Sequence, residues 1–167
     1  MQIRKMRKIL TLIVVMLNVT SHAQSPSDYK FQSISIAQGL SQSSAYAIFQ
    51  DYLGYMWIGT QGGMNRFDGY GVKKYEPDAN DSLSLGLGWR TAITEDANKI
   101  LWSGTSIGTF SYYDRKKDRW VNIDPKIISE IVKKYTQLSS GAGFVTKIHV
   151  DNKRNKLYAT TNVTGFI

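Results

Sequence analysis

The hydrophobic residues of this chain fall into short runs separated by turn residues, and one of these runs occurs more than once. Residues 51–60 read Asp-Tyr-Leu-Gly-Tyr-Met-Trp-Ile-Gly-Thr, and residues 96–105 read Asp-Ala-Asn-Lys-Ile-Leu-Trp-Ser-Gly-Thr, 45 positions later. A third and weaker copy begins at Asp151, with Leu157 in place of the tryptophan and Ala159 in place of the following glycine. A period in the forties built from short strands is typical of the blades of a β-propeller.

Each copy predicts a blade of short antiparallel strands. We expect the first blade at about 41–76, with strands at 45–50, 55–60, 64–68 and 72–75. The second blade is expected at about 89–123, with strands at 91–95, 100–105, 110–113 and 119–123. A third blade is expected to start at about 144–167, with strands at 145–150 and 157–161. Residues 55–60 are apolar on both faces of the pleat, as a strand between two other sheets requires. A further strand is expected at 31–36, where it would complete the last blade of a closed ring.

The step from the second copy to the third is ten residues longer, and the extra residues predict a helix at about 125–135. Asp124 suits the N-cap and Pro125 the first helical position. One helical face then carries apolar side chains, which we expect to pack on the third blade: Ile127, Ile128, Ile131, Val132 and Tyr135. The predicted fold is therefore all-β, an incomplete β-propeller of about two and a half to three four-stranded antiparallel blades with one short inserted helix.

The first 23 residues have the pattern of a signal peptide. A basic segment with Arg4, Lys5, Arg7 and Lys8 precedes an apolar run at 9–17, and Ser21-His22-Ala23 offers small residues for cleavage before Gln24. An uncleaved anchor is the alternative, but a spanning helix needs roughly 20 apolar residues. We therefore expect residues 24–167 to be exported to the periplasm as a partial propeller.

Removing that segment lowers the net charge of the chain. Four of the eight net positive charges lie in the basic segment, so the mature chain carries +4, spread along its length apart from Arg115-Lys116-Lys117. This distribution does not indicate nucleic-acid binding. The sequence contains no cysteine, which excludes disulfides and thiol chemistry and makes stability depend on packing.

Residues 39–68 resemble the two-component regulator propeller repeat. The resemblance lies in Gly-Leu-Ser-Gln-Ser-Ser at 39–44 and in Ile-Phe-Gln-Asp-Tyr-Leu-Gly-Tyr-Met-Trp-Ile-Gly-Thr-Gln-Gly-Gly-Met-Asn-Arg-Phe-Asp at 48–68, and Asn-Asp-Ser-Leu-Ser at 80–84 resembles a linker common in such sensors. That repeat fills the periplasmic sensor of bacterial hybrid two-component systems, many of which respond to glycan fragments.

The resemblance implies what the rest of such a protein contains. A full sensor has many blades, then an immunoglobulin-like module, a membrane helix and a histidine kinase, and it self-associates as a dimer at the inner membrane. This chain is expected to be an N-terminal part without the kinase, since neither His22 nor His149 lies in a phosphoacceptor motif. An oligosaccharide is the expected ligand, and contact with the membrane would come only from parts outside this chain.

No catalytic, cofactor-binding or metal-binding residue is predicted. Asp51, Asp96 and Asp151 recur at the blade period and are interpreted as turn caps, and Trp57 and Trp102 as blade-packing residues. The loop cluster Asp78, Asn80 and Asp81 lacks the spacing of a calcium loop and is interpreted as a linker. The candidates for stacking on a sugar ring are the aromatic residues near strand ends: Trp89, Tyr112 and Tyr113.

Three functions stay open on this evidence. The first is a non-enzymatic, exported sensor segment whose ligand changes the arrangement of a dimer. The second is a segment of an exported propeller lyase or glycosidase with its active site on other blades. The third is a purely structural propeller that binds other proteins. The coding sequence after Ile167 separates the three, because a membrane helix and a kinase follow only in the first.

The blade count also predicts behaviour in solution. Each blade buries its faces only against its neighbours, so the end blades of a partial ring expose apolar faces and unpaired strand edges. We expect residues 24–167 alone to be poorly soluble or to self-associate, which light scattering after size exclusion measures. A monomer with a sharp, cooperative melt would contradict this prediction.

Overall fold

The computed structural model describes residues 30–81, 84–135, 143–154, 156–162 and 165–166. Residues 34–167 form one compact unit, and residues 30–33 belong to a separate N-terminal unit. The predicted signal peptide at 1–23 lies outside the described residues.

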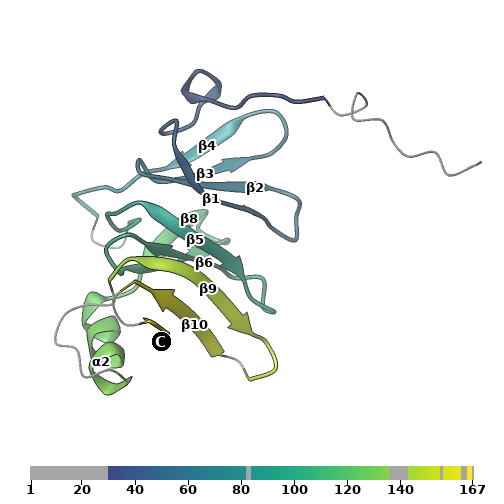
Figure 1. Cartoon of the computed structure of the whole chain (residues 1–167). Coiled ribbons are helices and arrows are strands. Elements are labelled where there is room, and N and C mark those ends of the chain that lie inside the picture. The colour runs from purple at the N-terminus through teal and green to yellow at the C-terminus, as the bar shows by residue number, and fades with distance from the viewer. Residues whose placement is uncertain (1–29, 82–83, 136–142, 155, 163–164, 167) are drawn as a thin grey trace, which may run out of the picture. The chain divides into compact units, whose positions relative to one another are not determined.

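The strands form three antiparallel sheets that follow one another along the chain (Figure 1). The first sheet contains β1 (Ala45–Gln50), β2 (Met56–Thr60), β3 (Met64–Phe67) and β4 (Val72–Tyr75). The second sheet contains β5 (Arg90–Glu95), β6 (Leu101–Thr105), β7 (Phe110–Asp114) and β8 (Arg119–Asn122). The third sheet contains β9 (Val145–Asp151), β10 (Lys156–Thr161) and β11 (Gly165–Phe166). Within each sheet the strands pair in chain order, as in a propeller blade. The predicted all-β propeller architecture is confirmed.

The first strands of the three blades lie side by side, β1 next to β5 and β5 next to β9. Each of them carries a register shift at the same repeat position, so that one residue is left without a partner on the second strand: Tyr46, Thr91 and Thr146. Such a β-bulge bends the strand and changes the direction of the extra side chain. The three blades therefore share the same backbone structure, including the bulge in the first strand. This holds even for the third blade, which has leucine in place of the tryptophan.

The predicted strand at 31–36 is wrong. Residues 31–35 form no strand, and Ile36–Gln38 is a short 3-10 helix, η3. Ser35 caps it, since its side chain accepts from the amide of Ala37 at 3.2 Å while Gln38 accepts from the amide of Ser35 at 2.9 Å. These local hydrogen bonds satisfy the backbone that a strand would otherwise pair with a neighbour.

The inserted helix is present as α2 (Pro125–Tyr135), and Asp124 is its N-cap. The Asp124 carboxylate accepts from the amide of Lys126 at 2.9 Å. Ile128 packs against a core that includes Phe110 of the second blade and Ala159 of the third. The helix therefore covers the junction between two blades and not the third blade alone. The side chains of Ile131, Val132 and Tyr135 lie outside the described part.

In each of the first two blades, a hydrogen bond joins the recurring aspartate, in the turn between the first and second strands, to the tryptophan on the second strand. In the first blade the Trp57 indole N–H donates to Asp51 at 2.9 Å, and in the second the Trp102 indole N–H donates to Asp96 at 3.1 Å. The other carboxylate oxygen of Asp51 accepts from the amides of Leu53 and Tyr55, both at 3.0 Å. The aspartates are thus turn caps, as predicted, and they also satisfy the buried indole.

Each of these tryptophans faces the next blade. Trp57 is fully buried and meets Tyr113 and Trp120 of the second blade edge to face, with ring centroids 4.7 and 5.5 Å apart. Trp102, which is half-buried, lines an apolar cavity of about 230 Å³ with Leu157 and Ala159 of the third blade. The two tryptophans therefore occupy equivalent places in successive blade interfaces.

The glycine two residues after each tryptophan lies against the next blade, with no room for a side chain. A Cβ atom on Gly59 would lie 2.6 Å from the carbonyl oxygen of Arg90, and one on Gly104 would lie 2.6 Å from a methyl carbon of Val145. Arg90 and Val145 begin the first strand of the following blade in each case. The Trp-x-Gly-Thr pattern thus encodes a large residue that fills the interface and a glycine that permits close approach.

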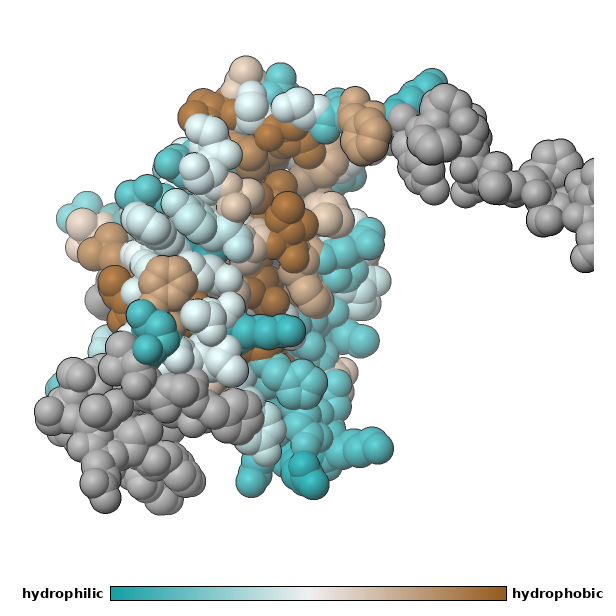
Figure 2. Space-filling model, in the orientation of Figure 1, coloured by the Kyte–Doolittle hydropathy of each residue, from teal (hydrophilic) through white to brown (hydrophobic). Residues whose placement is uncertain are grey.

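One face of the molecule is rich in exposed hydrophobic residues. Figure 2 shows them gathered over the first sheet, in the upper half of the picture. Ile48 of β1 is 63% exposed and Ile36 of η3 is 55% exposed. On this blade Leu40 is buried, and Ser41 donates its amide to Asn65 of β3 at 2.8 Å.

The close approach at Gly59 generates a prediction on stability. Gly59→Ala places a methyl group against the Arg90 backbone, so we expect a loss of about 1–3 kcal/mol in the free energy of unfolding. Urea denaturation of the full chain measures it. Gly71→Ala is the matched control, because a Cβ there meets nothing within 4 Å. If the two variants unfold at the same urea concentration, the blades do not approach as described.

Candidate functional site

The three aromatic residues predicted to bind a ligand do not form one site. Trp89 directly precedes β5, whereas Tyr112 and Tyr113 lie near the end of β7. Because β5 and β7 both pair antiparallel with β6, they run in the same direction. Trp89 therefore lies at the end of the blade where β5 begins, and Tyr113 toward the opposite end.

Trp89 forms a partly exposed aromatic pair with Tyr46. The two rings are stacked, with centroids 5.1 Å apart and planes at 21°, and they are 38% and 41% exposed. We call this pair the aromatic platform. Ser106 holds the backbone of Trp89 in place by two hydrogen bonds, of 3.1 and 3.0 Å.

Tyr46 is a site residue that the sequence did not reveal. It is the extra residue of the bulge in β1, so its direction does not follow the alternation of a regular strand. The only signal in the sequence is that the same repeat position carries Thr91 and Thr146 in the other blades. An aromatic residue appears at this position only in the first blade among the three repeats.

The other candidates line an open pocket of about 370 Å³ at the opposite end of the blades. Its wall is built from turns of the first and second blades and from the end of β7, and most of its residues are aromatic or basic: Tyr52, Asn98, Lys99, Ile100, Tyr112, Tyr113, Asp114, Arg115 and Lys116. Tyr112 is half-buried and tilts against Trp102, with centroids 5.9 Å apart. Tyr113 is only 3% exposed and packs among Trp57, Tyr75 and Trp120, so it offers no open ring face to a sugar.

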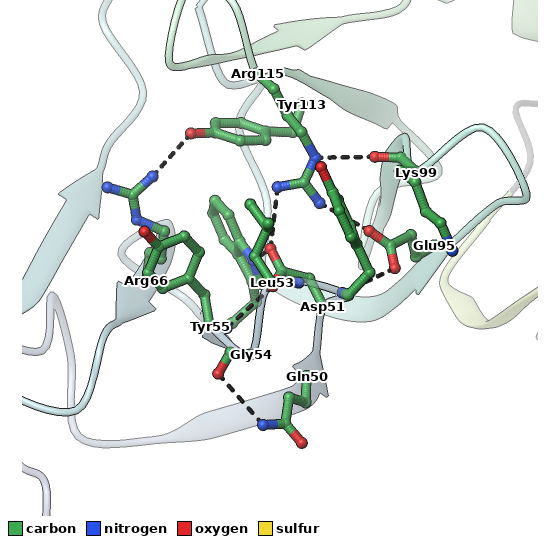
Figure 3. Close-up of polar contacts among 12 residues, drawn as sticks. Gln50, Asp51, Leu53, Gly54, Tyr55, Arg66, Glu95, Lys99, Tyr113 and Arg115 are labelled. Carbon is green, nitrogen blue, oxygen red and sulfur yellow. Dashed lines mark hydrogen bonds and ion pairs between the residues drawn. The ribbon is translucent and has the colours of Figure 1, made fainter.

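Arg115 dominates the polar side of this pocket and joins the two blades (Figure 3). Its guanidinium donates to Asp51 at 3.0 Å, to Glu95 at 2.7 Å and to the carbonyl oxygen of Lys99 at 2.9 Å. The ring of Tyr52 lies 4.9 Å from the guanidinium carbon. Each of the three guanidinium nitrogens thus donates to a protein group, which indicates a structural role.

The same turn of the second blade contributes a second interblade contact through Asp118. Its carboxylate accepts from Tyr75 of the first blade at 2.7 Å and from Tyr113, and it pairs with Lys73. Partial burial acts to raise the pKa of Asp118, but hydrogen bonds from Lys73, Tyr113 and Tyr75 outweigh it and hold the pKa well below the usual range. Burial raises the pKa of Tyr113, which keeps it a phenol donor.

The acidic residues with a predicted role all hold turns. Asp96 accepts from the amide of Ile100 at 2.9 Å, and Asp151 accepts from the amides of Lys153 and Arg154 at 3.0 and 3.1 Å. Asp78 accepts from the amide of Asn80 at 2.9 Å within the linker. In the described part of the chain, no group of three or more His, Asp or Glu residues is placed to hold a metal ion.

The described residues include no helix with the length and apolar character needed to cross a membrane. His149 lies exposed on β9.

Comparison with known proteins gives three findings. Residues 39–62 match the family model of the two component regulator propeller. A segment of 59 residues, 35% of this chain, is 44% identical to Histidine kinase P4 of Formosa agariphila and covers 4% of that protein. The crystal structure of the extracellular domain of a putative hybrid two component system from B. thetaiotaomicron superposes with a TM-score of 0.59 at 21% identity, over 81% of this chain and 19% of that one.

This chain spans only a small part of the length of either relative. The family match covers the first blade from Gly39 through the tryptophan strand, the histidine kinase shares a closely related segment, and the solved extracellular domain shares the sheet arrangement. Residues 39–62 carry the two-component regulator propeller repeat, and the sheets of this chain are arranged as in the solved extracellular domain.

Proposed function

We propose that this chain is the periplasmic ligand-sensing propeller of a hybrid two-component sensor, and that it responds to glycan fragments through the aromatic platform. The observation that carries the proposal is the stacked pair of Tyr46 and Trp89, both more than a third exposed. Fold packing does not require this pair, because the other repeats have threonine in place of Tyr46.

The surroundings of the platform suit a sugar. Aromatic ring faces contact the C–H faces of pyranose rings, and polar groups at the edge bind hydroxyls. Leu87 and Ile107, both well exposed, lie on the loops beside Trp89, and these loops also carry Ser106 and Thr109. An apolar surface with hydroxyl groups at its border is what a neutral oligosaccharide would contact.

The lyase or glycosidase alternative finds less support. A glycosidase needs two carboxyl groups that face each other across the scissile bond. Asp51 accepts from two amides, an indole and a guanidinium, and Asp96 from an amide and an indole. These carboxylates are used in turns and in blade contacts, so the sensor is the function that the described residues favour.

The rest of the sensor is part of the same proposal. Export through cleavage after Ala23, attachment to the inner membrane, a dimer formed by the full sensor and a kinase that follows the propeller are all inferred from the family resemblance. In this scheme the chain transmits binding and does no chemistry itself.

Trp89→Ala tests the platform. We expect it to weaken binding of the best ligand from a panel of β-glucan and xylan fragments by about fivefold, because an aromatic stacking contact contributes about 1 kcal/mol. Calorimetric titration of the full chain measures the affinity. Tyr70→Ala is the control, since Tyr70 is almost fully exposed on another turn, and Tyr112→Ala examines the opposite pocket. Equal affinity of Trp89→Ala and wild type, or loss only in Tyr112→Ala, would refute the platform, and no binding by any fragment would refute glycan sensing by this chain.

A further inference from the structure

Directly after Trp89, the chain buries a positive charge that no acidic side chain of the described residues neutralises. Arg90 is 0% exposed. None of the ion pairs of the described residues includes Arg90, and the internal segments outside the described structure contain no Asp or Glu. Burial lowers the pKa of Arg90 to about 10, so the guanidinium stays charged at neutral pH.

The hydrogen bonds that Arg90 makes are long and go to neutral oxygens. One terminal nitrogen donates to the Ser111 hydroxyl at 3.5 Å, and the other donates to the carbonyl oxygen of Leu87 at 3.4 Å. The Nε atom has no partner among the described residues. An uncompensated buried charge is strongly destabilising, and neutral acceptors remove only part of that cost.

A second buried donor lies beside the guanidinium. Ser103 is 0% exposed and its hydroxyl also has no partner in the described structure. Ser103 is opposite Ser111 in the β6–β7 register, which places their side chains on the same face roughly 5 Å apart. The Ser111 hydroxyl in turn accepts from Arg90 at 3.5 Å and donates to Asn122 at 3.3 Å. The guanidinium and two hydroxyl groups therefore converge in the interface between the first and second blades.

The fold does not require these residues at these positions. Arg90 pairs with Thr105 in the register where the other blades have Ala45 with Thr60 and Val145 with Thr161. In the same way, Ser103 follows Trp102 where Ile58 follows Trp57. The second blade thus has a cation, Arg90, at a position where the other blades have a small or aliphatic residue. It also has a small hydroxyl donor, Ser103, at a position where the first blade has a bulky aliphatic residue.

We propose that Arg90 and Ser103 form a buried site, lined by Ser111, for a small monovalent anion of the size of chloride. The anion would accept from Arg90 Nε and from the Ser103 hydroxyl, and it would supply the negative charge that the protein lacks there. All three side chains are fully buried, which excludes a larger anion such as a sugar carboxylate. Because Arg90 also donates to Leu87, two residues before Trp89, the anion would hold the loop that carries the platform.

Thermal unfolding of the full chain in potassium chloride and in potassium gluconate, at equal ionic strength, tests the site. Gluconate is too large to enter a closed interface. A ligand that binds only the folded state raises Tm, and we expect chloride to raise it by about 5 °C. Identical melting in the two salts would overturn the proposal and leave ordered water as the partner of these groups.

Variants show whether Arg90 is responsible. Arg90→Met keeps an unbranched side chain without the charge and is expected to melt at the same temperature in both salts. Arg154→Met, at an exposed arginine, is the control and should keep the wild-type chloride response. A chloride response that persists in Arg90→Met would refute the site.

Two further measurements do not depend on the folding of Arg90→Met. Ser103→Ala removes one donor and should shift the chloride response to about tenfold higher concentration. Crystals of the full chain soaked in bromide should show an anomalous peak in contact with Arg90 Nε. An unchanged response in Ser103→Ala, or no bromide peak beside Arg90, would count against the proposal.

Discussion

In the recurring aspartate and tryptophan pair, the indole N–H that enters the blade interface finds an acceptor, and this hydrogen bond organises the repeat, whereas the buried indole N–H of Trp120 has no partner among the described residues. Asp51 and Asp96 supply that acceptor from the turn six residues earlier. The same carboxylates hold the turn amides, so one residue fixes the turn, the rotamer of the tryptophan and the surface offered to the next blade. In the third copy Leu157 needs no acceptor, and the second oxygen of Asp151 is paired with Arg154 at 3.1 Å instead.

The glycine that follows sets how closely the next blade can lie. With Trp57 filling the interface and Gly59 allowing contact with the backbone of Arg90, the two blades meet through a core of buried aromatic and aliphatic side chains. The turn at 114–118 then adds charged contacts at the edge of that surface, through Arg115 to Asp51 and through Asp118 to Tyr75. The exposed hydrophobic side chain of Ile48 on β1 marks the face of the first sheet that packs on no described blade.

The parts of the structure that recur in the sequence were the parts that could be predicted. The strands, turns and helix α2 follow from periodic hydrophobic positions, from the repeated aspartate and from Asp124-Pro125. Arg115 was visible only as part of a basic cluster, because its partner Asp51 lies 64 residues away in another blade. The 3-10 helix η3 carries its own signal in Ser35 and Gln38, which outweighs the β-branched and aromatic residues that suggested a strand.

Tyr46 and Arg90 are harder to predict, for a physical reason that also makes them informative. A bulge changes the direction of Tyr46, and the charge on Arg90 contradicts the burial that its position imposes. Residue types that recur at the same position in the repeats are the ones that blade packing requires. A residue of a different type at such a position is not required by packing, so its cost must be compensated by some other interaction. Tyr46 finds that compensation in Trp89, whereas Arg90 Nε and the Ser103 hydroxyl have no partner among the described residues. Tyr46 stacks on Trp89, and Arg90 directly follows Trp89 in the sequence. Trp89 therefore connects the buried charge to the surface where a ligand is expected.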